Sequence, residues 1–116
     1  TIAELAERVL DELPAELVTK LGHVAIVLEP RPSVELVQSG FDSRTLGLFE
    51  GATLSEHGEL GVAETPSRVV LFTACLIDAY GADEAEIRDQ VRITVLHELG
   101  HFLGLEEHDL ERLGLD

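Results

Sequence analysis

Two histidines in the last third of the chain have the spacing of a pair of metal ligands. His97 and His101 are four residues apart in the segment Val-Leu-His-Glu-Leu-Gly-His-Phe-Leu-Gly (95–104). In an α-helix, which has about 3.6 residues per turn, their imidazole rings project from the same face, one turn apart. Two rings placed in this way can bind one tetrahedral zinc ion at distances of about 2.0–2.1 Å. We therefore predict one zinc ion per chain, held by His97 and His101.

The glutamate between the histidines has the chemistry of a general base. Glu98 follows His97 directly and so lies about 100° around the helix from it. It can face the open side of the metal without being a ligand, and there it can take a proton from an activated water molecule. We expect Glu98 to be catalytic. A pair of ordinary core histidines bonded to carbonyls or carboxylates is the alternative that needs no metal.

One long helix must position these three residues. Asp83, followed three residues later by Glu86, has the form of a capping box, and Gly104 can adopt the left-handed conformation that ends helices. These signals predict a helix over 84–103. Its second half is apolar almost all round, which predicts a central, buried helix whose histidines need polar partners. The core side is expected to carry Ile87, Val91, Val95, Leu96, Leu99, Phe102 and Leu103.

The rest of the chain mixes helical and extended patterns. Apolar residues at helical spacing predict a helix over 2–12, and a continuation over 15–21 after Pro14. Short apolar runs predict strands at 23–28, 46–51 and 68–73. Further helices are expected within 33–44, over 74–80 and over 109–113, with Asp109 as the N-cap of the last, while 55–66 is loop-like. This order favours an α+β fold with a small mixed sheet, in a single domain over 1–116.

Composition limits the partners and the compartment. The chain has 116 residues and a net charge of −15, so nucleic acid and anionic membranes are unlikely partners, whereas cationic peptides and metal ions are attracted. Its one cysteine, Cys75, cannot form an internal disulfide, which favours a reducing, cytoplasmic location. We expect no membrane span, because no apolar run approaches about 20 residues. We also expect no signal peptide, because the first residues are acidic and amphipathic.

The segment from His97 to Glu107 resembles a known signature. It is similar to the metzincin pattern H-E-x-x-H-x-x-G-x-x-H, and more similar to H-E-x-x-H-x-x-G-x-x-D of a family of small bacterial zincin-like metallopeptidases. Residues 46–51 and 66–72 also look like segments of that family, so the resemblance covers roughly 20–115. It implies a compact metzincin-like domain with a few strands over the active-site helix. It also implies zinc binding by His97 and His101, Glu98 as the general base, and a turn at Gly104.

Two departures from these patterns bear on the site. The third-ligand position, three residues after Gly104, is Glu107 rather than His or Asp; we expect it to bind the metal, with His108 and Asp109 as alternatives. The chain contains no methionine and therefore no methionine-containing turn under the metal. Because residues 105–116 are so few, we also expect no C-terminal subdomain to form the far wall of a cleft.

Together these features predict a zinc-dependent metallopeptidase whose partner is a peptide or protein substrate. The strand at 68–73 is expected to be an edge strand that pairs with the substrate backbone. Tyr80 and His57 are candidates for stabilising the oxyanion. Two alternatives stay open: a zinc-binding module that has lost catalysis, and a structural domain without a metal.

Overall fold

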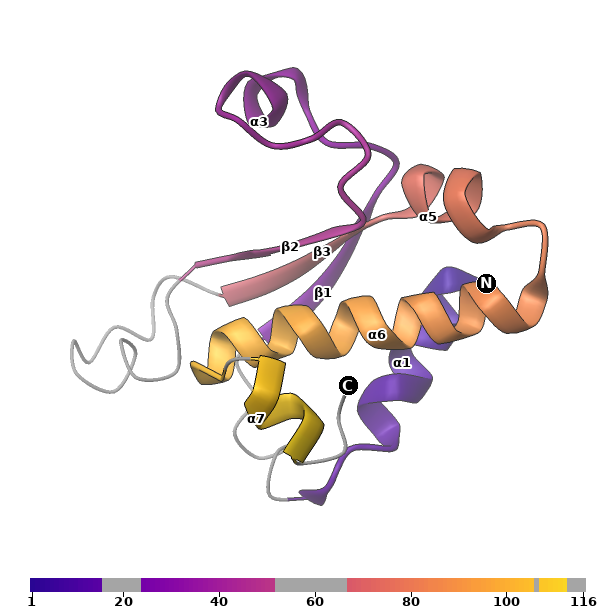
Figure 1. Cartoon of the computed structure of the whole chain (residues 1–116), viewed down its shortest axis with the longest axis vertical. Helices are drawn as coiled ribbons and strands as arrows, with labels where there is room; N and C mark the ends of the chain where they lie inside the picture. The colour runs from indigo at the N-terminus through magenta and orange to yellow at the C-terminus, as the bar shows by residue number, and fades with distance from the viewer. Residues whose placement is uncertain (16–23, 52–66, 106, 113–116) are drawn as a thin grey trace.

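Three short strands form a mixed sheet in the order β1-β3-β2 (Figure 1). The computed structural model describes residues 1–15, 24–51, 67–105 and 107–112. β1 (Val24–Glu29) runs parallel to β3 (Ser67–Phe72), and β2 (Gly47–Glu50) runs antiparallel to it. The sheet and the helices packed on it confirm the predicted α+β class with a small mixed sheet.

β3 is the central strand, so its prediction as an edge strand is wrong. It has hydrogen-bonded neighbours on both sides. Val69, Val70 and Leu71 are fully buried, so both faces of the strand are covered. A continuous apolar run is typical of a strand buried on both faces, whereas an edge strand would leave one row of backbone groups free.

The longest helix lies between the sheet and another helix. α6 (Glu84–Leu103) packs against β2 and β3 on one side and against α1 (Ile2–Asp11) on another (Figure 1). This position explains why the second half of α6 is apolar almost all round. The main core joins the sheet to both helices and contains Ala6, Val69, Leu71, Leu76, Val91, Val95, Leu99 and Phe102.

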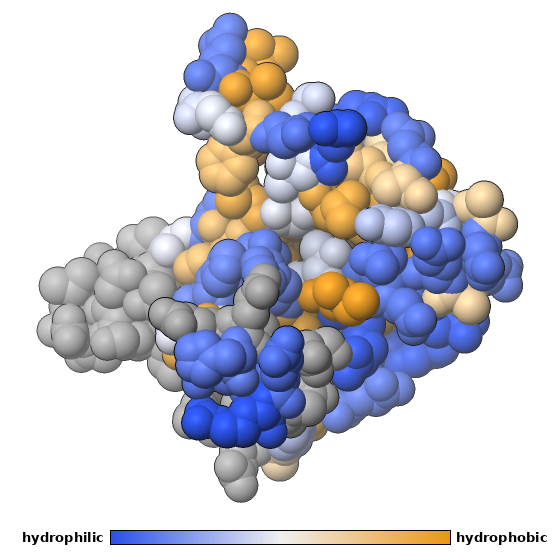
Figure 2. Space-filling view, in the orientation of Figure 1, coloured by the Kyte–Doolittle hydropathy of each residue, from blue (hydrophilic) through white to orange (hydrophobic). Residues whose placement is uncertain are grey.

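A smaller apolar cluster covers the other face of the sheet. Val70 and Phe72 pack there with Cys75 of α5 (Thr73–Tyr80), and Leu36 of α3 (Val34–Gln38) joins them. Otherwise α3 stands away from the body and leaves Val34 and nearby side chains exposed, which gives the apolar surface at the top of Figure 2. No helix in the described part of the chain combines the length and the apolar character that a membrane span requires.

The helix boundaries agree with the sequence where local signals are strong. α6 begins and ends as predicted: the Asp83 side chain accepts hydrogen bonds from the amides of Ala85 and Glu86, and Gly104 has φ 75°. α7 (Glu107–Arg112) begins two residues earlier than expected, so Asp109 is not its N-cap and instead contacts Arg112 at 3.0 Å. The predicted continuation over 15–21, beyond Ala15, and the predicted loop at 55–66 lie outside the described residues.

β2 approaches α6 closely at a glycine. A Cβ atom on Gly47 would lie 2.6 Å from Cγ2 of Thr94 and 3.2 Å from the carbonyl oxygen of Val70. The Thr94 contact is shorter than real carbon atoms allow, so a side chain at this position would push the strand away from the helix. Gly47 therefore sets the spacing between β2 and α6.

We predict that Gly47→Ala lowers the free energy of unfolding by roughly 1–3 kcal/mol, as overpacking in a core does. Urea denaturation measures the change. Thr94→Ser removes the methyl group that the new Cβ would meet, so Gly47→Ala should cost less in that background. If the two substitutions are additive in a double-mutant cycle, the close approach does not limit stability.

Candidate metal centre

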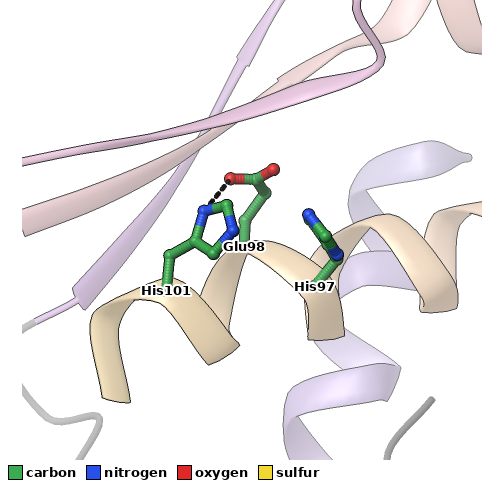
Figure 3. Close-up of side chains that lie close together, drawn as sticks. All are labelled: His97, Glu98 and His101. Atoms are coloured by element: carbon green, nitrogen blue, oxygen red, sulfur yellow. Dashed lines mark ion pairs between the residues drawn. The ribbon is translucent and has the colours of Figure 1, made fainter. Parts of the chain in front are cut away.

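α6 brings His97, Glu98 and His101 together on one stretch of helix (Figure 3). The two imidazole rings lie 4.7 Å apart between centroids, inclined at 65°. The ligand atoms of the three side chains all lie within 4.8 Å of one another. The i, i+4 spacing therefore places the rings side by side, as the sequence predicts.

The Glu98 carboxylate is buried and contacts one of the rings. The residue is only 7% exposed, and its Oε2 lies 3.3 Å from Nδ1 of His101. A buried carboxylate needs such a partner because leaving a charge buried and unpaired is costly. The expectation that both histidines are buried is wrong: His97 is half-buried and the side chain of His101 is 51% exposed. His101 projects from a side of α6 that the core does not cover, although Gly100 and Phe102 beside it are buried.

These donors fit a zinc ion. Imidazole nitrogens and carboxylate oxygens are both ordinary zinc ligands. Two ligands of a tetrahedral ion bound at about 2.0–2.1 Å lie roughly 3.4 Å apart. Since the three donor atoms are already within 4.8 Å of one another, rotations of the side chains suffice to bring two or three of them to that spacing.

The turn after α6 directs the chain back toward the helix. The amide of Leu105 donates to the carbonyl of Gly100 at 2.8 Å, and that of Gly104 donates to the carbonyl of His101 at 3.1 Å. This pair of hydrogen bonds is a Schellman motif, which needs the left-handed conformation of Gly104. The motif ends α6 directly after the histidines, and α7 packs against α6.

All three candidates for the third ligand lie on the first turn of α7 rather than on an open turn. The side chain of Glu107 lies outside the described structure. His108 is exposed, with Nε2 3.5 Å from Oδ1 of Asp109. Asp109 is 20% exposed and also contacts Arg112, so its carboxylate is already engaged. Glu107 therefore stays a prediction, as do the roles of the other two.

β2 runs alongside the segment that carries the histidines. Gly47 lies against Thr94, and the ring of Phe49 meets that of Phe102 edge to face at 6.0 Å. Thr94 and Phe102 flank this segment on α6. The part that Gly47 plays was not predicted from the sequence, although a glycine within a strand often marks the close approach of another chain segment.

Tyr80 does not approach the candidate metal centre. It is the last residue of α5, three positions before the N-cap of α6, and its carbonyl accepts from the amide of Asp83. The fourteen residues of helix from Asp83 to His97 span about 20 Å. His57, the other candidate for the oxyanion, lies outside the described residues.

A family model for zincin-like metallopeptidases matches residues 21–115. The match includes the sheet, α6 and α7, and it agrees with the resemblance found in the sequence. The comparison with curated proteins gave no match.

We predict that zinc stabilises the protein through the two histidines. At a free zinc concentration of about 100 times Kd, the free energy of unfolding should rise by roughly 2.7 kcal/mol. The double variant His97→Ala and His101→Ala should lose this gain and its bound metal, whereas Gln90→Ala, two turns earlier on α6, should keep both. Thermal unfolding and elemental analysis measure these effects. One zinc per chain in the double variant would refute the site.

Proposed function

Because this chain belongs to the zincin-like metallopeptidase family, we propose that it is a zinc-dependent peptidase whose single zinc ion is bound by His97 and His101. The observation that carries the proposal is the buried Glu98 carboxylate beside the two imidazole rings. A carboxylate held in a fixed position beside the histidines can serve as the base that zinc-dependent peptide hydrolysis uses.

Zinc, when bound, supplies Lewis acidity that polarises the scissile carbonyl and makes water a better nucleophile. The Glu98 carboxylate accepts the proton that this water loses, and then delivers it to the nitrogen of the leaving amine. Its burial restricts the carboxylate and keeps bulk solvent away, which strengthens its electrostatic interactions. The contact with His101 holds the carboxylate on the side of the helix where the histidines lie.

We propose an extended peptide as the substrate, bound along the outer edge of β2. An extended chain can add a strand to an exposed sheet edge through backbone hydrogen bonds. Among the strands of the described residues, β2 is an outer strand whereas β3 is central, and β2 runs alongside the histidine-bearing segment. The net charge of −15 favours cationic peptides by long-range attraction.

A zinc-binding module without turnover is the second candidate. The absence of methionine motivates it, because the chain cannot build a methionine turn beneath the metal. Incubation with a mixed peptide library, with and without a chelator, distinguishes the two. New peptide termini that disappear with the chelator support the peptidase; a zinc-loaded protein that produces none supports the binding module.

We predict that Glu98→Gln keeps zinc but lowers peptide cleavage by about 10²–10⁴-fold, because glutamine is nearly isosteric and cannot accept the proton. The matched control is Glu86→Gln, an exposed glutamate in the first turn of the same helix, which should cleave like the wild type. Mass spectrometry of the peptide library and elemental analysis give the two readouts. More than about a tenth of wild-type activity in Glu98→Gln would remove Glu98 as the base.

We propose Glu107 as the third protein ligand. Its position on the first turn of α7, which packs against α6, supports this role, and a carboxylate oxygen binds zinc at about 2.0–2.2 Å. His108 is the better zinc ligand chemically, but it is exposed and adjacent to Asp109. Asp109 would have to leave Arg112 to bind the metal.

The loss of a residue that only supports a metal ligand lowers metal affinity by roughly 10–100-fold. We predict that Glu107→Gln, which removes a ligand itself, weakens zinc binding by more than that. His108→Ala and Asp109→Asn should change the affinity less. Competitive zinc titration against a chromophoric chelator ranks the three variants. If His108→Ala loses affinity while Glu107→Gln binds like the wild type, the family's ligand position does not apply to this chain.

A further inference from the structure

A cavity lies at the opposite end of α6 from the candidate metal centre. The first turns of α1 and α6, together with the end of α5, surround a cleft of about 420 Å³. This volume is within the range of small-ligand sites, roughly 300–1,000 Å³. Ile87 lines the cleft and is ten residues, or about 15 Å of helix, from His97. The cleft is therefore separate from the site that would bind zinc.

Two arginines line this cleft without a carboxylate partner. Among the described residues, neither Arg8 nor Arg88 forms an ion pair or a side-chain hydrogen bond. Four other arginines each contact a carboxylate within 3.3 Å, namely Arg31, Arg44, Arg68 and Arg112. In a chain with 23 acidic and 8 basic residues, two unpaired arginines on one cleft leave a place for an anionic group.

The cleft is also lined by two negatively charged glutamates and by apolar side chains. Glu4 and Glu84 line the cleft one turn before Arg8 and Arg88 on the same helices, so the four side-chain charges sum to zero. The apolar surface comes from Leu5, Ile77 and Ile87, and Ile77 is 54% exposed. A pure anion would meet both glutamates. A ligand that carries both charges and an aliphatic group can satisfy the whole lining.

The first turns of α1 and α6 both contribute to the cleft, and their glutamates offset the partial positive charge that the aligned peptide dipoles leave there. The arginines, one turn further along each helix, form the positive part of the lining. Residues 1–20, which include α1, lie outside the family match, so about half of the cleft is built by a part of the chain that the family model does not cover.

We infer that this cleft binds a short zwitterionic aliphatic peptide, such as a dipeptide of leucine. Its carboxylate contacts Arg8 and Arg88, its ammonium group contacts Glu4 or Glu84, and its side chains cover Ile77 and Ile87. The inference rests on the lining of the cleft and not on peptidase activity.

The probe is the dipeptide Leu-Leu, titrated into the ¹⁵N-labelled full chain and followed by NMR, with a chelator present. The Glu98→Gln variant serves as a second sample in which the dipeptide cannot be hydrolysed. We expect saturable amide shifts in α1, in α5 and in the first turns of α6, with a Kd on the order of 1 mM. N-acetyl-Leu-Leu, which lacks the ammonium group, and Leu-Leu amide, which lacks the carboxylate, should each bind at least tenfold more weakly.

Three variants locate the contacts. Arg8→Gln and Arg88→Gln should each weaken Leu-Leu binding several-fold, while Arg44→Gln, whose arginine pairs with Asp42 elsewhere, should not. Within the described part of the chain, neither Arg8 nor Arg88 bonds to another side chain, so we expect the substitutions to preserve the fold. Ile77→Ser tests the apolar contact independently. The inference is overturned if the blocked peptides bind as tightly as Leu-Leu, if the shifts centre on His97 and His101, if no saturable shift occurs, or if no variant weakens binding.

Discussion

The structure depends above all on the burial of one helix, α6, between the sheet and α1. Val91, Val95 and Phe102 are fully buried in the core that joins the three layers. Because these side chains are packed on several sides, the helix cannot turn about its axis without opening cavities. Cavities in a close-packed interior lower the stability of the fold. The face that carries His97 and His101 is therefore fixed by the apolar residues on the other faces. Packing, rather than the histidines themselves, orients the candidate metal centre.

The same burial gives the two ends of α6 different surroundings. At its C-terminal end the side chain of His101 is half exposed, whereas Glu98, one turn earlier, and Phe102 beside it are buried. This contrast suits a site that must admit a substrate yet hold a carboxylate away from bulk water. At its N-terminal end, α1 and α5 diverge from the helix and leave the cleft lined by Arg8 and Arg88. One helix thus carries the candidate metal centre near one end and lines the cleft near the other.

β2 shows how a short strand can define the edge of a site. It has only four residues, and its position is held on one side by the close contact of Gly47 with Thr94. On the other side, Arg68 of β3 bonds to Glu50 at 2.8 Å. A residue larger than glycine at position 47 would separate the strand from the segment of α6 that carries the histidines. Stability and site geometry therefore depend on the same contact.

The sequence by itself determined the features that arise within a few turns of one helix. Asp83 and Gly104 bound α6, and the spacing of His97 and His101 brings their rings together, because each effect involves residues close in sequence. Only the tertiary structure decided which strand is central, how far His101 is exposed and where Gly47 meets Thr94. Those features depend on contacts between segments tens of residues apart, such as β1 with β3. Local sequence patterns do not specify which of these segments will pair. Sequence periodicity could tell that β3 is buried, but only the order of the strands in the sheet places β3 at the centre and β1 and β2 outside it.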